Sequence, residues 1–443
     1  MTSDPFTEGR PDGPSTHPAR FSPGPRRADD RRVAVASVVV AAAYLVAAAG
    51  AAAAISTGAA ATPSAAWLPL HLALAGGAST AIAGVMPFFV AALSAGHPAP
   101  PRLRAAAVAM VAIGAGLVAT HALAPELSAG VPVSALGGAV YLGGIAATAA
   151  CVRASGRGGL MARRPIVTAG YLLALANVGV GATLGTLVLA GWEPLVSQLV
   201  ALRAAHAWTN LIGFVSLVIL STLLHFLPTV LGTRIVPRRS ATIAVLGVAL
   251  GSPLVVAGLL TGVGAVAGGG AVLTLAGIAG LGAEARAVRA TRGRWTTDAA
   301  WHRMASMGLL AGVVWFGVGA GLASALMLAR AVGLVGGDGA WQSALVAGPL
   351  AIGWVIQVLV ASWTHLLPSI GPGGPVAHAI QRTLLGRAAS ARLVALNLGA
   401  ALVAIGWPTG IAPLAAAGVA LAAVAVVGSA GLAWSALGVR TGR

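Results

Sequence analysis

The stretch that decides the fold is residues 213–229, which read GFVSLVILSTLLHFLPT. Residues 353–369 read GWVIQVLVASWTHLLPS, so the same glycine–aromatic pair, histidine and leucine–proline pair recur at one fixed offset. A shorter echo, GVMP at residues 84–87, places a third proline almost the same distance before Pro228 as Pro228 lies before Pro368. A fixed period across uncharged stretches indicates an internally repeated helical protein.

The composition excludes most soluble classes. Of 443 residues, 58% are hydrophobic and 8% are charged, and the mean hydropathy is +0.90. Soluble proteins carry about 25% charged residues, so this chain needs a lipid bilayer as its partner. The net charge is +17, but no arginine stripe with interleaved aromatic residues occurs, which argues against nucleic-acid binding. The single cysteine, Cys151, excludes a disulfide framework and a cysteine-ligated zinc or iron–sulfur site within the chain.

Twelve apolar runs are long enough to cross a membrane, which takes about 20 residues. Residues 1–32 are polar and predict a disordered cytoplasmic tail. The predicted spans are 33–55, 66–95, 104–124, 131–152, 165–190, 200–231, 240–261, 264–284, 300–329, 342–368, 389–407 and 411–437. We therefore predict an all-α, twelve-helix membrane domain over residues 33–440.

Arginines gather in alternate loops, as the positive-inside rule requires. Only Arg203 and Arg330 fall in the predicted outer loops. This pattern predicts a multi-pass protein of the inner (plasma) membrane with both termini in the cytoplasm. Combined with the repeat, it predicts three quasi-equivalent four-helix units, at about 33–152, 165–290 and 300–438.

Histidines are the chemically informative residues inside the spans. His71 and His206 lie at similar depth near the outer face, and Arg203 and Asn210 share a helix face with His206. His225 and His365 lie near the inner face, each three residues before a proline. All four histidines are candidate metal ligands, and all four could instead hydrogen-bond backbone carbonyls within the bundle. No Asp or Glu lies deep in a span, which argues against ion-coupled antiport.

The stretch HAWTNLIGF at residues 206–214, continuing to Leu227-Pro228, resembles a helix of the haem–copper oxidase subunit I superfamily. The resemblance is greatest to the nitric-oxide-reductase and C-type-oxidase branch and to NnrS membrane proteins. It implies twelve helices in three four-helix arcs, haem and copper as cofactors, and a redox partner or other membrane subunits. It also implies that His71 and His206 are axial ligands and that Arg203 pairs with a haem propionate, with Asn210 beside the site.

The chain departs from the pattern of that branch at several positions. The second histidine of its His-x-His motif is Trp208 here, and the equivalent positions of the tenth span are Val346 and Gly348. The seventh span has no His-His pair. We therefore expect haem or copper binding without a complete oxygen- or nitric-oxide-reducing centre, and we assign no catalytic residue. A cofactor-free permease-like protein and a non-catalytic assembly subunit on the same fold are the alternatives.

The two outer histidines allow two arrangements. A shared bis-histidine haem site requires a slot between the second and sixth spans, with Cα atoms roughly 12–14 Å apart, wider than directly packed helices. Small residues would have to line it, and those available are Gly76, Gly77, Ala78 and Gly213. In the other arrangement, which the resemblance favours, His71 and His206 face different pores.

Overall fold

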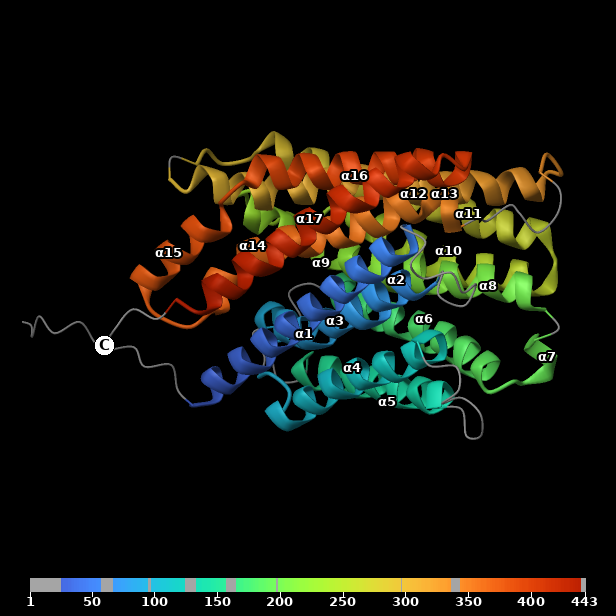
Figure 1. Cartoon of the computed structure of the whole chain (residues 1–443), viewed down its shortest axis with the longest axis horizontal. Helices are drawn as coiled ribbons and strands as arrows, with labels where there is room; N and C mark the ends of the chain where they lie inside the picture. Colours follow the sequence, from blue (N-terminus) through green and yellow to red (C-terminus); the bar gives the residue numbers. More distant parts are fainter. Residues whose placement is uncertain are drawn as a thin grey trace, which may run out of the picture.

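The computed structural model describes eight stretches of the chain, namely residues 25–56, 67–94, 97–123, 133–156, 165–196, 198–295, 297–335 and 343–439. Within them the secondary structure is helical, and twelve helices are long and apolar enough to span a membrane. The helices run side by side along the long axis of the molecule (Figure 1). The chain is a multi-pass, all-α membrane bundle, as the apolar runs predicted.

Nine of the spanning helices are continuous. They are α1 (Pro25–Ser56), α4 (Pro101–Leu123), α5 (Val133–Gly156), α6 (Pro165–Leu189), α10 (Arg239–Thr261), α11 (Gly264–Ala290), α12 (Ala299–Ala331), α16 (Ala389–Thr409) and α17 (Ala412–Leu437).

The second, sixth and tenth spanning helices, which we call the inner helices, each contain a π-helical segment. The second consists of α2 (Leu68–His71), η2 (Leu72–Ala78) and α3 (Ser79–Ser94); the sixth of α8 (Leu199–Trp208), η4 (Thr209–Ser216) and α9 (Leu217–Val230); the tenth of α13 (Ser343–Val346), η6 (Ala347–Ile356) and α14 (Gln357–Ile370).

The three π-helical segments lie at corresponding places in the repeat and contact one another pairwise. Each inner helix also carries its repeat proline, Pro87, Pro228 or Pro368, within its second half. These helices are the most buried in the bundle, with 67%, 89% and 67% of their apolar windows inside the protein. The shared π-helical turn supports the three-unit organisation. It is a feature that composition does not reveal, because π-helices are rare single-turn insertions with no clear residue preference.

The N-terminal end of the domain differs from the prediction. Residues 25–32, which the polar composition assigns to the tail, form the first turns of α1. Pro25 is well suited to the first helical position, and the following arginine and alanine residues favour helix. The predicted disorder of residues 1–24 lies outside the described residues.

Two short helices lie outside the spans. They are α7 (Glu193–Val196) and α15 (Pro375–Leu385). In α15, Ala377, Gln381 and Leu385 are buried, whereas Val376 and Ile380 are exposed on the opposite side. This helix was not predicted, because its glycine- and proline-rich flank (residues 371–375) favoured a loop.

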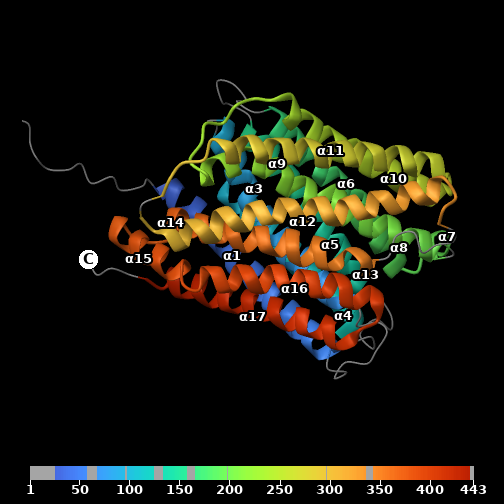
Figure 2. The same ribbon diagram turned by 90° about the horizontal axis from the view of Figure 1, so that it is seen from above.

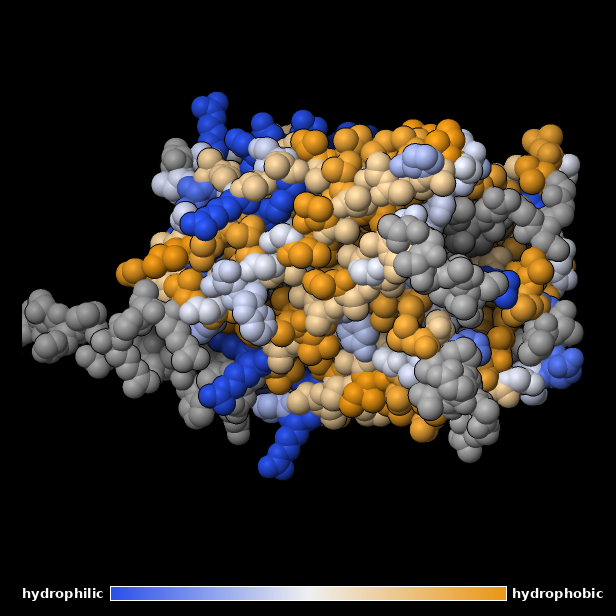
Figure 3. Space-filling view, viewed as in Figure 1, coloured by the Kyte–Doolittle hydropathy of each residue, from blue (hydrophilic) through white to orange (hydrophobic). Residues whose placement is uncertain are grey.

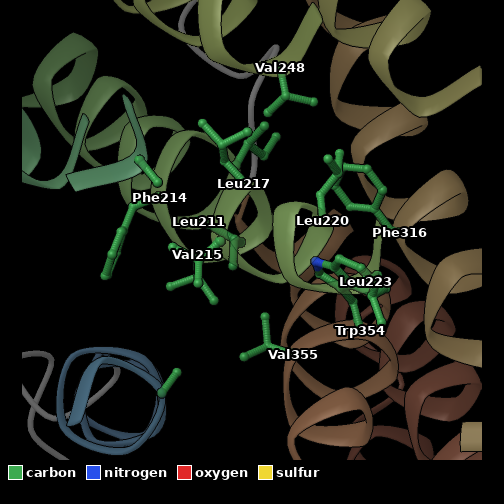
Figure 4. Close-up of a cluster of buried hydrophobic side chains, with 14 of the residues drawn as sticks. Leu211, Phe214, Val215, Leu217, Leu220, Leu223, Val248, Phe316, Trp354 and Val355 are labelled. Carbon is green, nitrogen blue, oxygen red and sulfur yellow. The ribbon is translucent and has the colours of Figure 1, made fainter. Parts of the chain in front are cut away.

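Large apolar side chains join the inner helices in the core. Figure 4 shows Leu220 and Leu223 of the sixth helix beside Phe316 of α12 and Trp354 of the tenth helix. The indole Nε1 of Trp354 donates a hydrogen bond to Ser216 Oγ at 2.9 Å, linking two π-helical segments. Outside this core, the paired helices α10 and α11 run alongside each other in Figure 2.

The surface matches a lipid environment. Val314 and Val424 are 65% and 71% exposed, and Figure 3 shows apolar side chains over the middle of the bundle. Hydrophilic residues gather at the end that carries α15. The start of α1 and the end of α17 lie at this same end (Figure 1), as an even number of spans requires.

The orientation of the bundle is a prediction that thiol labelling tests. Trp192 and Thr291 are exposed at opposite ends of the bundle, and the native Cys151 is buried, so it gives little background. We expect Trp192→Cys to react with a membrane-impermeant maleimide in intact cells and Thr291→Cys to react only after lysis. The reverse pattern would contradict the arginine-based orientation.

Candidate functional site

The two outer histidines lie side by side between the second and sixth helices. The ring centroids of His71 and His206 are 6.0 Å apart, and the ring planes are within 9° of parallel. Each histidine lies at or near the end of the α-helical turn that precedes a π-helical segment. The interpretation that they face different pores is therefore wrong: one site contains both rings.

The backbone of α6 fixes the orientation of the His206 ring. His206 Nδ1 lies 2.9 Å from the carbonyl oxygen of Gly181. A carbonyl can only accept, so Nδ1 carries the proton and Nε2 keeps a lone pair for a ligand. Asn210 Nδ2 donates to the His206 backbone carbonyl at 2.8 Å and lies 3.3 Å from Nδ1.

Two glycines of α6 make this arrangement possible. A Cβ atom on Gly181 would lie 2.5 Å from Asn210 Oδ1, and one on Gly185 would lie 2.9 Å from His206 Cε1. The glycines therefore let the sixth helix approach α6 closely enough for the histidine to reach a backbone carbonyl.

His71 is restrained by a neighbour on its own helix. The Trp67 ring meets the His71 imidazole edge-on at a centroid distance of 4.3 Å. The backbone thus engages one nitrogen of His206, and the side chains of both histidines are only half-buried. The second nitrogen of the His206 ring remains for a ligand.

Of the other predicted residues, one joins this site and one does not. Asn210 contacts His206, as their common helix face predicted. The Arg203 side chain is exposed, so it lies at the outer surface of the sixth helix.

A polar cluster below His206 was not predicted from the sequence. Thr209 Oγ1 donates to the Asn177 backbone carbonyl at 3.2 Å and to Asn177 Oδ1 at 3.4 Å. Gly213 leaves room for both Asn177 and Ser252, whose side chains a Cβ would strike. Buried hydrogen bonds of this kind specify the relative position of helices in lipid. The available signal was Asn177, a polar residue in the middle of the fifth span.

His121 also lies closer to the site than its position in the sequence suggests. Its ring is 6.4 Å from Trp67, so His121, Trp67, His71 and His206 form a row of rings across three helices. Its position near the end of its apolar run gives no sign of this contact.

The inner histidines pack among aromatic rings. His365 stacks on Trp301 at 5.0 Å and meets the edge of Phe226 at 5.5 Å. The His225 ring lies 5.1 Å from Phe89 in an edge-on arrangement. Over the described ranges, no group of three or more His, Cys, Asp or Glu residues is placed to hold a metal ion.

Comparison with known proteins gives one kind of match. No protein-family model and no curated protein matches the chain. Solved structures do match, and one of them covers 94% of this chain and 84% of its own, with a TM-score of 0.62 and 13% sequence identity. It is the cryo-EM structure of a heme-copper terminal oxidase dimer. The chain has the fold of a heme-copper terminal oxidase. At so low an identity, the likeness establishes the fold alone.

The glycines expected to line a haem slot between His71 and His206 do not line one. Cα atoms of η2 and η4, the π-helical segments that follow the two histidines, approach within 8 Å. The glycines expected to line a slot contact other helices: Gly76 packs on Tyr44, Gly77 on Leu45, and Gly213 on Ser252 and Asn177. The slot prediction was therefore wrong, because these residues serve close helix packing.

The distance between the His71 and His206 rings can be compared with that of two imidazoles on one metal centre. Two metal–imidazole bonds of about 2.0–2.1 Å, together with the half-widths of the two rings, add to roughly 6 Å. The observed centroid separation is 6.0 Å. The separation of the two ring centres therefore equals the one expected for two imidazoles bound to one metal centre.

Proposed function

We propose that this protein is a membrane protein that holds one metal ion between His71 and His206, without a complete oxygen- or nitric-oxide-reducing centre. The observation that carries the proposal is the pair of near-parallel imidazoles, 6.0 Å apart. In His206, the Gly181 carbonyl engages Nδ1 and leaves Nε2 for the ion.

Copper in its monovalent state suits this pair best. Imidazole nitrogen is a ligand for copper, zinc, iron and nickel. The predicted spans supply no carboxylate deep in the bilayer. The ligands are therefore neutral, and no negative side chain there offsets the charge of the ion. A single positive charge costs less to desolvate than a double one. Bound copper would supply one-electron oxidation and reduction.

The chain's own residues would orient the ligands. The Gly181 carbonyl fixes the His206 tautomer and ring angle, and Asn210 braces the same turn. Such outer partners raise the basicity of a metal-binding histidine and restrict its rotation. The edge of Trp67 limits movement of the His71 ring from the other side.

The tenth helix supports the proposal that the oxygen- or nitric-oxide-reducing centre is incomplete. At the positions that correspond to the two histidines of the His-x-His motif, this chain has Val346 and Gly348. A Cβ atom on Gly348 would lie 2.5 Å from the Ala400 carbonyl oxygen and 2.7 Å from Ala404 N. The close approach of α16 therefore excludes any larger residue at this position, a ligand included.

Metal analysis of the purified protein tests the proposal. The protein is extracted in mild detergent, incubated with copper(I) under a weak chelator, desalted, and measured by mass spectrometry of its elements and by absorption. We expect about one copper per chain, as one bis-imidazole site requires, and no haem band. A haem absorption band would show that the protein binds haem and would contradict the proposal of a single copper ion. Protein that retains neither would favour the permease or assembly alternative.

A glycine substitution tests the orienting role of α6. Gly185→Ala would push the His206 ring, because the new Cβ lies 2.9 Å from Cε1 and 3.2 Å from Nδ1. We expect a loss of copper affinity of roughly 10–100-fold, the range for disturbed outer partners, with an unchanged unfolding temperature. Gly179→Ala on the same helix is the control, since no atom lies within 4 Å of its Cβ. Equal affinity for both variants would contradict the positioning role.

A further inference from the structure

A cavity of about 90 Å³ lies between the three inner helices. It begins at Ala78, so the whole of η2 (Leu72–Ala78) lies between His71 and the cavity. It is therefore separate from the proposed metal site. Three labelled residues in Figure 4, Val215, Leu223 and Val355, belong to its lining.

The lining follows the internal repeat. Residues of the second, sixth and tenth helices contribute from positions that correspond when the repeat prolines are aligned. The resulting triplets are Ala78, Ile219 and Leu359; Ala81, Thr222 and Ser362; Ile82, Leu223 and Trp363; and Val85, Phe226 and Leu366. The cavity therefore lies on the pseudo-threefold axis of the bundle.

Small residues on one helix create the space. Where the sixth and tenth helices have Ile219 and Leu359, the second helix has Ala78, and Ala81 stands opposite Thr222 and Ser362. The surrounding helices do not close this gap, so the lining atoms lack packing partners on the cavity side. Such atoms lose dispersion energy that a bound molecule of the right size restores.

The lining offers little to water. The atoms that face the cavity are almost entirely hydrocarbon, and its polar side chains are those of Thr222, Ser362 and Trp363. The Thr222 hydroxyl is already bonded to the Val218 carbonyl at 2.8 Å and lies 2.9 Å from the Tyr171 hydroxyl. A buried water needs two to four polar partners, and apolar cavities without them stay dry and take up apolar guests.

We propose that this axial cavity is a binding site for one small, uncharged, apolar molecule, of the size of xenon or a hydrocarbon of two or three carbons. The site is built from all three repeat units and needs neither histidine of the outer pair. Its occupant would reach it through the apolar bundle rather than through a charged or hydrated path.

Xenon is the probe for this site. Crystals of the full chain are pressurised with xenon and the anomalous signal is located. We expect one xenon between Ala81, Thr222 and Ser362 in the wild-type protein. Absence of xenon there, or ordered water in its place, would overturn the proposal.

Matched alanine-to-leucine variants separate the cavity from the lipid-facing surface. Ala81→Leu fills the cavity and should abolish the axial xenon, and Ala78→Leu should do the same from the next turn. Ala47→Leu, at an exposed position of α1, should leave it unchanged. Axial xenon that persists in both cavity variants would contradict the assignment of the site. The wild-type crystal tests the proposal without any variant, so poor folding of one variant does not prevent the test.

Discussion

We expect His206→Ala and His71→Ala each to lower copper affinity by more than about 100-fold, since disturbing an outer partner alone costs roughly 10–100-fold. Either change removes one of the two imidazoles that lie 6.0 Å apart, and the remaining ring cannot hold the ion alone. Titration with a copper(I) chelator of known affinity measures the effect. If both histidines bind the same ion, the double variant will be no worse than either single variant.

His365→Ala is the control for this experiment. It removes an imidazole from the same bundle, but one that stacks on Trp301, three residues before Pro368 in the tenth helix. We expect full copper content in this variant, with at most a loss of stability. Copper loss in His365→Ala equal to that in His206→Ala would instead move the metal site to the inner histidines.

The second large effect concerns two adjacent glycines of α11. A Cβ atom on Gly270 would lie 2.6 Å from both the Gly251 carbonyl oxygen and Val255 N, whereas no atom lies within 4 Å of a Cβ on Gly269. Gly270→Ala must force α10 and α11 apart, and we expect a loss of about 1–3 kcal/mol in unfolding free energy, as for an overpacked core.

Gly269→Ala should instead raise the free energy of unfolding. Alanine favours helix over glycine by up to about 1 kcal/mol, and nothing at this exposed position opposes it. Thermal unfolding in detergent, followed by tryptophan fluorescence, compares the two variants. A Gly270→Ala protein as stable as the Gly269→Ala protein would contradict the close packing of this helix pair.

The sequence was sufficient to predict the twelve spans, because a bilayer requires about 20 apolar residues per helix and this chain separates such runs with arginine-rich loops. The inner helices were also recognisable, since the prolines Pro228 and Pro368 recur at a fixed offset. Both signals depend on composition and spacing along the chain, which sequence records directly.

The pairing of His71 with His206 was not predictable in the same way. It depends on how far each helix is rotated about its axis, and the π-helical segments η2 and η4 alter that rotation just below the two rings. The Gly181 carbonyl that orients His206 has no side-chain signal. By contrast, α15 could have been found, because Val376 and Ile380 alternate with Ala377 and Gln381 at helical spacing.

The outer pair of histidines breaks the molecule's internal symmetry. When Pro87 is aligned with Pro228 and Pro368, His71 does not align with His206. The copies of His71 in the other units are Ile212 and Ile352, and the copy of His206 in the third unit is Val346. The three units therefore share one architecture but differ in the side chains that they bring to the histidine site. Two units each supply one imidazole, from positions that do not correspond, and the third supplies only hydrocarbon.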